Sequence, residues 1–149
     1  MRIAAAQYPV LRPQGWSEVE DRIADWFAKA AAAGAQLLVF PEYAAMTLTP
    51  LCGPVAELNL HRQIEALQAW REPWLELHRS LAKRFSVYAL AGSMPWRVAA
   101  DRYHNRAWLC TPSGRADFQD KLVMTRFERE EWSIAAGEPD VPEIGRAHV

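Results

Sequence analysis

Glu42 is the first residue of this sequence that suggests chemistry. It follows Pro41 directly after the apolar run Leu37–Phe40, in the stretch GAQLLVFPEYAAM. In open α/β sheets, ligands gather beyond the carboxyl ends of the strands, and proline stiffens the entry to the turn that carries the acid. By position alone, Glu42 is either a proton-transferring carboxylate at a ligand site or a capping or salt-bridging acid where a strand meets a loop.

Lys121 and Glu128 are the other charged residues of interest. Both lie in the segment DFQDKLVMTRFEREEW, residues 117–132. Lys121 is expected near the end of a strand, and Glu128 follows it in a charged segment. Taken by themselves, these two residues are as typical of a solvated charge cluster as of a catalytic site.

The elements around Glu42 predict an α/β unit. The stretch RIAAAQYPV, residues 2–10, favours a short strand. Ser17 and Glu20 have the spacing of a capping box and predict a helix start. Apolar residues then recur at helical spacing up to Gly34, a typical helix C-terminal cap. The run AQLLVF, residues 35–40, is typical of a strand that is covered on both faces.

The rest of the chain predicts further helix and strand without an internal linker. Residues 44–55 resemble a loop, and residues 55–85 have a helical pattern broken at Pro73. Residues 86–95 predict a third strand ending in Gly92–Ser93. Residues 103–124 predict a β-hairpin with its turn at Pro112–Gly114. The whole length of 149 residues suits one domain.

Composition excludes several classes of protein. The formal net charge is −1 and 23% of the residues are charged, with acids and bases interspersed, so we expect no nucleic-acid partner and no membrane-surface patch. The most apolar region, residues 30–40, is far shorter than the ~20 residues that cross a bilayer. The N-terminal apolar run is too short for a secretion signal. We therefore expect a cytoplasmic protein, and the two cysteines show neither metal nor redox spacing.

Four motifs, taken together and in order, resemble the carbon–nitrogen hydrolase family, also called the nitrilase superfamily. They are RIAAAQ, QLLVFPEY, LAGS and the segment YHNRAWLCTPSGRADFQDKLVMTRFE. The resemblance extends from Arg2 to about Arg146. It implies an α-β-β-α sandwich of two facing sheets, of which residues 1–149 are the N-terminal portion of a single domain and therefore incomplete.

The resemblance also implies roles for the charged residues. Glu42 matches the general base, Lys121 matches the lysine that stabilises the tetrahedral intermediate, and Glu128 matches the second glutamate, although Glu130 and Glu131 lie close enough to share that assignment. The physics is consistent, because flanking carboxylates keep a lysine cationic even in an apolar pocket. We therefore expect Glu42 to be buried and held against Lys121.

Two features depart from the family pattern. Many members have proline where Met124 stands, which affects the local turn. The family's cysteine nucleophile follows the second glutamate on a strand that opens with a Gly-Arg or Gly-Lys pair. Here Gly145–Arg146 supplies the pair, and the cysteine is expected beyond Val149.

Neither cysteine of the chain, and no histidine, is expected to replace that nucleophile. Cys110 lies in a hairpin strand, where a small buried hydrophobic role is usual. Cys52 has no nearby turn or helix start that would lower its pKa. His78 borders an apolar helix face and predicts a packed residue. For Tyr43, Trp96 and Trp132, packing is favoured over lining of a pocket.

Three functional hypotheses follow. The first is a carbon–nitrogen hydrolase that acts on a small amide, nitrile or carbamoyl compound through a Glu-Lys-Cys triad, without cofactor or metal and as a homo-oligomer. The second is a catalytically inactive assembly or binding module that keeps the fold. The third is an unrelated small α/β binding domain with Glu42 as a ligand contact. The hydrolase hypothesis predicts that the side chains of Glu42 and Lys121 lie within hydrogen-bond reach, whereas the unrelated domain does not require it.

Overall fold

The computed structural model describes residues 1–9, 12–54 and 59–138. In chain order, the elements are β1 (Ile3–Ala5), α1 (Trp16–Ala32), β2 (Leu37–Val39), the 3₁₀ helix η1 (Ala44–Cys52), α2 (Leu60–Leu67), the 3₁₀ helix η3 (Gln68–Trp70), α3 (Arg71–Phe85), β3 (Tyr88–Ala99), β4 (Arg102–Cys110), β5 (Ala116–Asp120), α4 (Arg126–Glu130) and β6 (Ile134–Ala135).

One mixed sheet organises these elements. Its strands lie in the order β1-β2-β3-β4-β5, and β6 pairs with β4. The pairs β1–β2 and β2–β3 are parallel, whereas β3–β4 and β4–β5 are antiparallel. The helical crossover α1 between β1 and β2 is what parallel neighbours require. The predicted α/β class, with its strand–helix–strand unit, is therefore confirmed.

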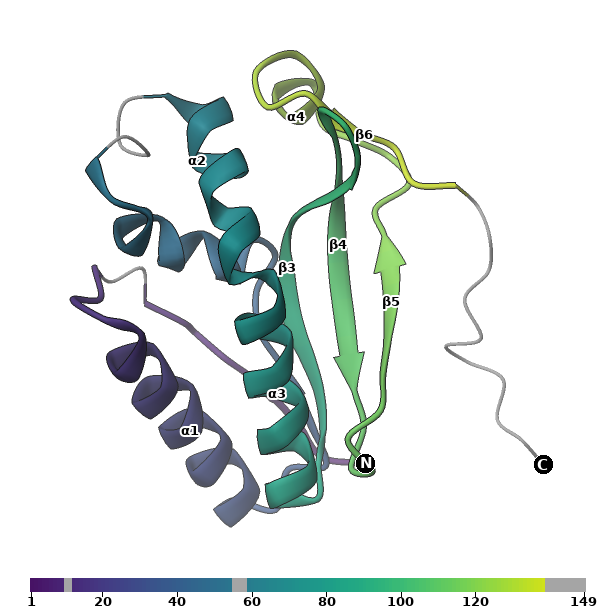
Figure 1. Ribbon diagram of the computed structural model, residues 1–149. Helices are drawn as coiled ribbons and strands as arrows, with labels where there is room; N and C mark the ends of the chain where they lie inside the picture. Colours follow the sequence, from purple (N-terminus) through teal and green to yellow (C-terminus); the bar gives the residue numbers. More distant parts are fainter. Residues whose placement is uncertain (10–11, 55–58, 139–149) are drawn as a thin grey trace.

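In the part of the chain that the structure describes, the long helices lie on one face of the sheet. Figure 1 shows α1, α2 and α3 on the same side of the strands. Ile23 and Phe27 of α1 and Trp74 of α3 are fully buried there, with Leu38 of β2 and Ala89 of β3 in the same apolar core. Burying such large side chains contributes most of the folding free energy.

The opposite face of the sheet is apolar and partly exposed. Ile3, Leu37 and Tyr88 are register partners on this face, and Ile3 and Tyr88 are 56% and 46% exposed. The prediction that residues 35–40 are covered on both faces is thus wrong for the described residues. Side chains alternate along a strand, so the helices bury Leu38 and leave Leu37 and Val39 half-buried.

Helix α1 begins differently from the prediction. Gly15, not Ser17, is its N-cap, and Ser17 lies inside the first turn. Glu18 supplies the acceptor at this end, because its carboxylate receives the backbone N–H of Gln14 at 2.7 Å. The predicted C-terminal cap is confirmed, since Gly34 follows the helix with a φ of 77°.

The helical pattern over residues 55–85 divides at η3, before Pro73. Residues 55–58 lie outside the described part, and Asn59 caps α2 by accepting from the backbone N–H groups of His61 and Arg62. Pro73 lies in the first turn of α3, where its missing N–H costs no hydrogen bond. The expected loop over residues 44–55 is largely the 3₁₀ helix η1, which buries Ala45 and Leu48 completely.

The third strand is longer than predicted. Gly92 and Ser93 do not end β3, which continues to Ala99. Ser93 pairs with Ala107, and the register shift between Leu90 and Ser93 accommodates Ala91 and Gly92 as a bulge. The predicted hairpin turn is confirmed. Gly114 adopts a φ of 82° and donates its N–H to Thr111, closing the connection between β4 and β5.

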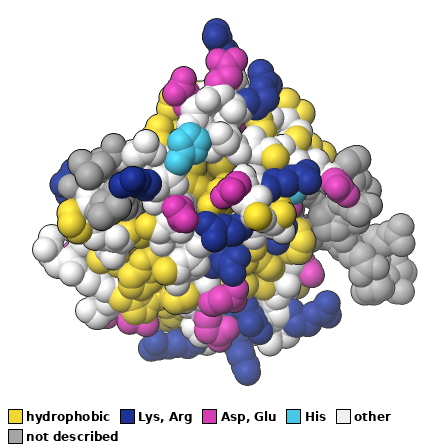
Figure 2. Space-filling view, turned by 45° about the horizontal axis from the view of Figure 1, so that its top comes forward, with side chains coloured by type: hydrophobic (Ala, Val, Ile, Leu, Met, Phe, Trp, Pro, Cys, Tyr) yellow, Lys and Arg dark blue, Asp and Glu magenta, His cyan; other side chains and the backbone are white. Residues whose placement is uncertain are grey.

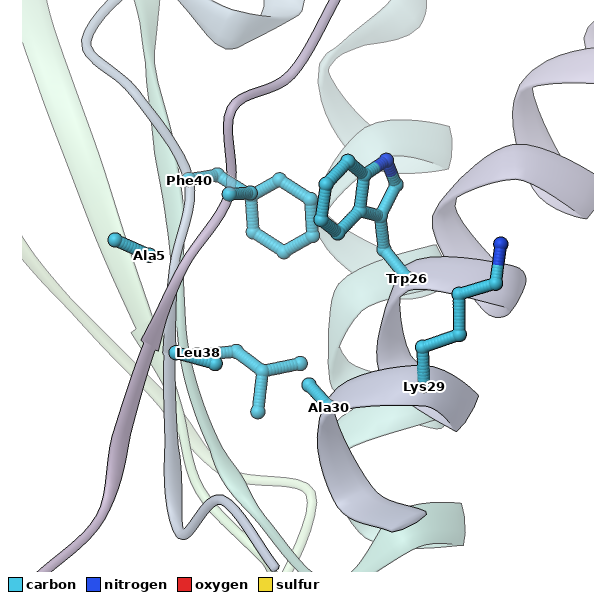
Figure 3. Close-up of a pocket in the computed structure, with 8 residues that line it drawn as sticks. Ala5, Trp26, Lys29, Ala30, Leu38 and Phe40 are labelled. Carbon is cyan, nitrogen blue, oxygen red and sulfur yellow. The ribbon is translucent and has the colours of Figure 1, made fainter. Parts of the chain in front are cut away.

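A small apolar cavity of about 220 Å³ lies between β1, β2 and α1. Figure 3 shows the rings of Phe40 and Trp26 directed toward each other, Leu38 directed toward Ala30, and Lys29 extending away. Lys29 pairs with Asp25 of the same helix at 2.6 Å. This cavity offers few polar groups that could orient a reactive substrate.

The described residues include no helix that is long and apolar enough to cross a membrane. On the face shown in Figure 2, acidic and basic side chains lie beside one another with hydrophobic side chains between them. This distribution matches the interspersed charges of the sequence.

Candidate active site

Glu42 lies on a sharp turn after β2. The N–H of Phe40 donates to the carbonyl of Leu90 at 2.9 Å, which carries the sheet pairing up to Pro41. Tyr43, immediately after Glu42, adopts the left-handed region with a φ of 57°. This conformation is unfavourable for a residue with a side chain, and it turns the chain so that Glu42 projects from the end of the strand.

Gly92 and Ser93 of the bulge hold this turn in place. The N–H of Tyr43 donates to Ser93 Oγ at 2.9 Å. Gly92 has a φ of 72°, and a Cβ atom there would lie 2.4 Å from the carbonyl oxygen of Pro41. Only glycine permits this approach of the two backbones, which explains the LAGS motif in physical terms.

Lys121 directly follows β5. Its backbone N–H donates to the carbonyl of Asn105 at 2.9 Å, and its carbonyl accepts the N–H of Gly137 at the same distance. The preceding residue, Asp120, accepts two hydrogen bonds from Arg106 at 2.7 and 2.8 Å and one from His104 at 2.8 Å. These contacts fix the end of the strand that carries the lysine.

Glu128 is positioned by the short helix α4. Thr125 and Glu128 form a capping box, in which Thr125 Oγ1 accepts the N–H of Glu128 and the Glu128 carboxylate receives the N–H of Thr125. The T-x-x-E signal was present in the sequence. Met124, which departs from the family pattern, is buried in a small apolar cluster with Tyr103 and Ile134.

The structure brings the three predicted residues together. Lys121 Nζ lies 2.9 Å from Glu42 Oε1, and 3.0 and 2.8 Å from the two carboxylate oxygens of Glu128. A lysine has three N–H donors. The three contacts, one to Glu42 and two to Glu128, match these three donors, so the ammonium group is held between the two carboxylates.

Two further residues of this site were missed. Asn105 Nδ2 donates to Glu42 Oε1 at 2.8 Å and to Glu128 Oε1 at 3.3 Å. The Tyr43 hydroxyl donates to Glu128 Oε1 at 2.5 Å, and Trp132 packs edge-on against the Tyr43 ring. The expected packing role is confirmed for Trp132, whereas Tyr43 also forms a hydrogen bond with a charged residue of the site. Trp96 is buried, as expected.

Burial and hydrogen bonding act in opposite directions on Glu128. Its side chain is only 5% exposed, and burial alone would raise its pKa. Hydrogen bonds from Lys121, Tyr43 and Thr125 outweigh burial and lower the pKa of Glu128 to about 2. Hydrogen bonds to Glu128 and Glu42 in turn raise the pKa of Lys121. The site therefore holds a cationic lysine and an ionised Glu128 at neutral pH.

Glu42 differs from the prediction in one respect. Its side chain is 54% exposed, compared with 27% for Lys121. The expectation that Glu42 is buried is wrong for the described residues. The reason is its place at the end of β2, on the sheet face that no helix of the described residues covers, where Lys121 and Asn105 contact a single oxygen.

A pocket of about 330 Å³ opens beside these charges. It combines apolar walls with a few convergent polar groups, as sites for small molecules usually do. Its lining consists of Phe40, Glu42, Leu90, Gly92, Ser93, Asn105, Ala107, Gln119 and Lys121. The pocket could hold a small polar molecule against the Glu42 carboxylate and the Lys121 ammonium group.

Neither cysteine belongs to this site. Cys110 is fully buried, five residues along β4 from Asn105 and therefore about 17 Å away on the other face of the sheet. Burial raises its pKa to about 12. Burial also raises the pKa of Cys52, whose thiol donates to the Leu48 carbonyl. The raised pKa values disfavour the thiolate form of both cysteines.

The described part of the chain also holds no metal-binding group of three or more His, Cys, Asp or Glu residues. His78 is fully buried among aromatic rings, and its Nδ1 contacts the Trp74 carbonyl at 2.9 Å. Burial lowers the pKa of His78 to about 4. The predicted packing role of His78 is confirmed.

Comparison with known proteins places this site in a family. The sequence profile of the carbon–nitrogen hydrolase family matches residues 2–139. "Probable hydrolase YhcX" of Bacillus subtilis (strain 168) is 25% identical over 138 residues, which are 93% of this chain and 26% of that protein.

Two solved structures share the fold. A carbon–nitrogen hydrolase from Helicobacter pylori G27 has a TM-score of 0.68 at 17% identity, covering 92% of this chain and 44% of that one. A cysteine-to-serine variant of a nitrilase-superfamily amidase from Nesterenkonia AN1 has a TM-score of 0.60 at 24% identity, covering 93% and 49%. This chain therefore spans about a quarter to a half of the length of these three proteins. With residues 2–139 matched by the family profile, the chain belongs to the carbon–nitrogen hydrolase family.

Proposed function

We propose that residues 1–149 form the N-terminal portion of a single hydrolase domain that cleaves a carbon–nitrogen bond in a small, non-peptide amide, nitrile or carbamoyl compound. The observation that carries the proposal is the position of Lys121 Nζ, within 3.0 Å of carboxylates from two separate segments. A cation beside a partly exposed carboxylate is what attack on a carbonyl requires, since one group stabilises the oxyanion and the other moves protons.

The nucleophile is expected to be a cysteine outside residues 1–149. Neither Cys52 nor Cys110 lines the pocket beside Glu42, and burial raises the pKa of both thiols, which disfavours them as nucleophiles. The family resemblance implies a Glu-Lys-Cys triad. The Gly145–Arg146 pair that would open the cysteine's strand lies outside the described residues.

The reaction proceeds in two halves. Glu42 accepts the thiol proton, the thiolate adds to the amide carbon, and the carbonyl electron pair forms an oxyanion that the Lys121 ammonium group stabilises. Collapse of this intermediate breaks the carbon–nitrogen bond, and the leaving amine takes the proton from Glu42. Water then adds to the thioester and gives its proton to Glu42. The carboxylic acid leaves, and the thiol regains its proton.

Small aliphatic amides are the first substrates to test. The amidase from Nesterenkonia, 24% identical to this chain, has been solved in complex with butyramide. A variant of the same amidase carries acrylamide joined to its active-site cysteine. The pocket beside Glu42, about 330 Å³ in volume, is large enough for amides of this size. Cytoplasmic location and homo-oligomerisation stay predictions.

Replacing Glu42 by glutamine is expected to lower kcat by at least about 10³-fold, because glutamine keeps the shape and the contacts of the side chain but cannot accept the thiol proton. The measurement is ammonia release from butyramide by the protein encoded by the gene's complete reading frame. Glu20→Gln, on the exposed side of α1, is the control and should keep wild-type turnover. Unchanged kcat for Glu42→Gln would contradict the proposed role.

A binding or assembly role is the second candidate. The observation that favours it is the apolar sheet face around Ile3, Leu37 and Tyr88, which no helix of the described residues covers. In that case the wild-type protein releases no ammonia from any small amide, and Glu42→Gln differs from wild type only in stability.

A further inference from the structure

Asn105 contacts all three charged residues of the site. Its backbone carbonyl accepts the N–H of Lys121 at 2.9 Å. Its side-chain amide donates to Glu42 Oε1 at 2.8 Å and to Glu128 Oε1 at 3.3 Å. Asn105 is 2% exposed and belongs to β4, so its amide is held by a central strand of the sheet.

The amide orientation is fixed by charge. Two carboxylates face this side chain, so the amide NH₂ must point toward them, since the reverse orientation would set the Asn105 oxygen against two anions. As a result, Asn105 Oδ1 is buried and has no hydrogen-bond partner among the described residues. A side chain that leaves an acceptor unsatisfied must gain more from its donors, and both donors serve the catalytic carboxylates.

The two oxygens of Glu42 are not equivalent. Oε1 accepts two hydrogen bonds, one from Lys121 Nζ at 2.9 Å and one from Asn105 Nδ2 at 2.8 Å. In the part of the chain that the structure describes, Oε2 receives no hydrogen bond. Since the Glu42 side chain is 54% exposed and lines the pocket, the open oxygen is the one that a thiol or a water molecule can reach.

We propose that Asn105 is a positioning residue that, together with Lys121, occupies Glu42 Oε1 and so leaves Oε2 as the atom that accepts the proton. This inference rests on the proposed function. Lysine alone would let the carboxylate rotate about its last bond, and either oxygen could then pair with Nζ. The second donor, fixed on β4, removes that freedom. Asparagine suits the task because it supplies two donors without adding charge between two anions.

The test compares Asn105→Leu with a matched variant, Gln68→Leu. Gln68 also uses its amide for two donated hydrogen bonds, to the carbonyls of Ile64 and Pro95. Its Oε1 accepts the backbone N–H of Arg97, and in the described part of the chain it forms no hydrogen bond with Glu42, Lys121 or Glu128. We expect Asn105→Leu to lower kcat for butyramide by about 30-fold to 100-fold with KM changed less than about threefold. The acidic limb of its pH–kcat profile should move to higher pH, because a donor to the ionised carboxylate is lost. Gln68→Leu should lose stability only.

A second variant and a second measurement keep the inference testable if Asn105→Leu fails to fold. Asn105→Asp keeps the shape but places a third carboxylate against Glu42 and Glu128, so we expect a larger loss of kcat than for Asn105→Leu above neutral pH. A double-mutant cycle of Asn105→Leu with Glu42→Ala, measured by urea unfolding, should show a coupling of about fivefold in the unfolding equilibrium constant. The matching cycle with Gln68→Leu should be additive.

The possible outcomes distinguish a failure of this inference from a failure of the proposed function. Wild-type protein that hydrolyses no amide overturns both. Active wild-type protein with unchanged kcat and pH profile in Asn105→Leu overturns only the role of Asn105, as does an additive cycle with Glu42→Ala. An equal loss of kcat in Asn105→Leu and Gln68→Leu also overturns the role of Asn105, because the effect would then come from stability alone.

Discussion

Replacing Lys121 by methionine is expected to abolish amide hydrolysis, with kcat lowered by at least about 10³-fold, because the oxyanion loses its charged donor. The same change leaves Glu128 as a buried anion that has lost its cation. We expect the free energy of unfolding to fall by about 2 to 3 kcal/mol, less than for a fully buried pair, since Lys121 is 27% exposed. Ammonia release and urea unfolding measure the two effects.

The pH dependence of stability gives this prediction a distinctive sign. The pKa of Glu128 is lowered to about 2 in the folded protein, so its stabilisation is present above the unfolded-state value of about 4.3 and is lost as the pH falls toward 2. Wild-type stability should therefore rise between these pH values, by about 3 kcal/mol from this residue. The rise should be smaller in Lys121→Met.

Lys29→Met is the matched control for Lys121→Met. Lys29 pairs with Asp25 on the exposed surface of α1, where a salt bridge contributes less than about 1 kcal/mol. This variant should keep both the stability and the pH dependence of the wild type. An Lys121→Met protein with wild-type turnover, or with an unchanged rise in stability, would show that the lysine is not the cation of the site.

Replacing Gly92 by alanine is expected to displace Glu42 and to destabilise the protein by more than about 3 kcal/mol, through strain at positive φ and steric overlap combined. Gly92 has a φ of 72°, and the new Cβ would lie 2.4 Å from the Pro41 carbonyl oxygen and 2.7 Å from Ala44 Cβ. Both neighbours belong to the turn that carries Glu42. The melting temperature and the rate of ammonia release should therefore both fall.

Gly53→Ala separates the two causes. Gly53 has a similar φ of 80°, yet no heavy atom lies within 4 Å of its Cβ position, so this variant measures backbone strain alone and should cost about 1 kcal/mol. If Gly92→Ala were no worse than Gly53→Ala, the close approach of Gly92 to Pro41 would have no part in positioning the acid.

The sequence predicted the charged cluster because each member sits in a local pattern. Glu42 follows an apolar strand, and Lys121 follows a hairpin whose turn glycine is explicit. The resemblance then joined Glu42 and Lys121 with Glu128. A single carboxylate after a strand has many structural explanations, whereas several motifs in a fixed order have few. The α/β class followed in the same way from one strand–helix–strand unit.

Contacts across the sheet could not be predicted in this way. Asn105 is 63 positions from Glu42, and Tyr43 is 85 positions from Glu128. No local pattern specifies such a pair, since it depends on which strands become neighbours and in what register. The exposure of Glu42 is also a tertiary property, because it depends on what covers the second face of the sheet.

Other misses had local causes. The sequence predicts a strand end at Gly92, because glycine usually interrupts strands. In the structure a bulge lets β3 continue, and Ser93 Oγ accepts the N–H of Tyr43. The helix start at Trp16 was missed because Gly15 caps it without a side chain, with Glu18 providing the acceptor. The capping box of α4 was not predicted either, although Thr125 and Glu128 have the spacing of one.

The measurement that tests the central claim most directly is mass spectrometry of the protein from the complete reading frame, acid-quenched during turnover of butyramide. We predict a mass increase of one butyryl group, located by peptide mapping on a cysteine outside residues 1–149, and its loss in Lys121→Met. A butyryl group on Cys52 or Cys110, or ammonia release without any acylated cysteine, would contradict the claim that the Glu42–Lys121–Glu128 cluster serves a nucleophile outside this chain.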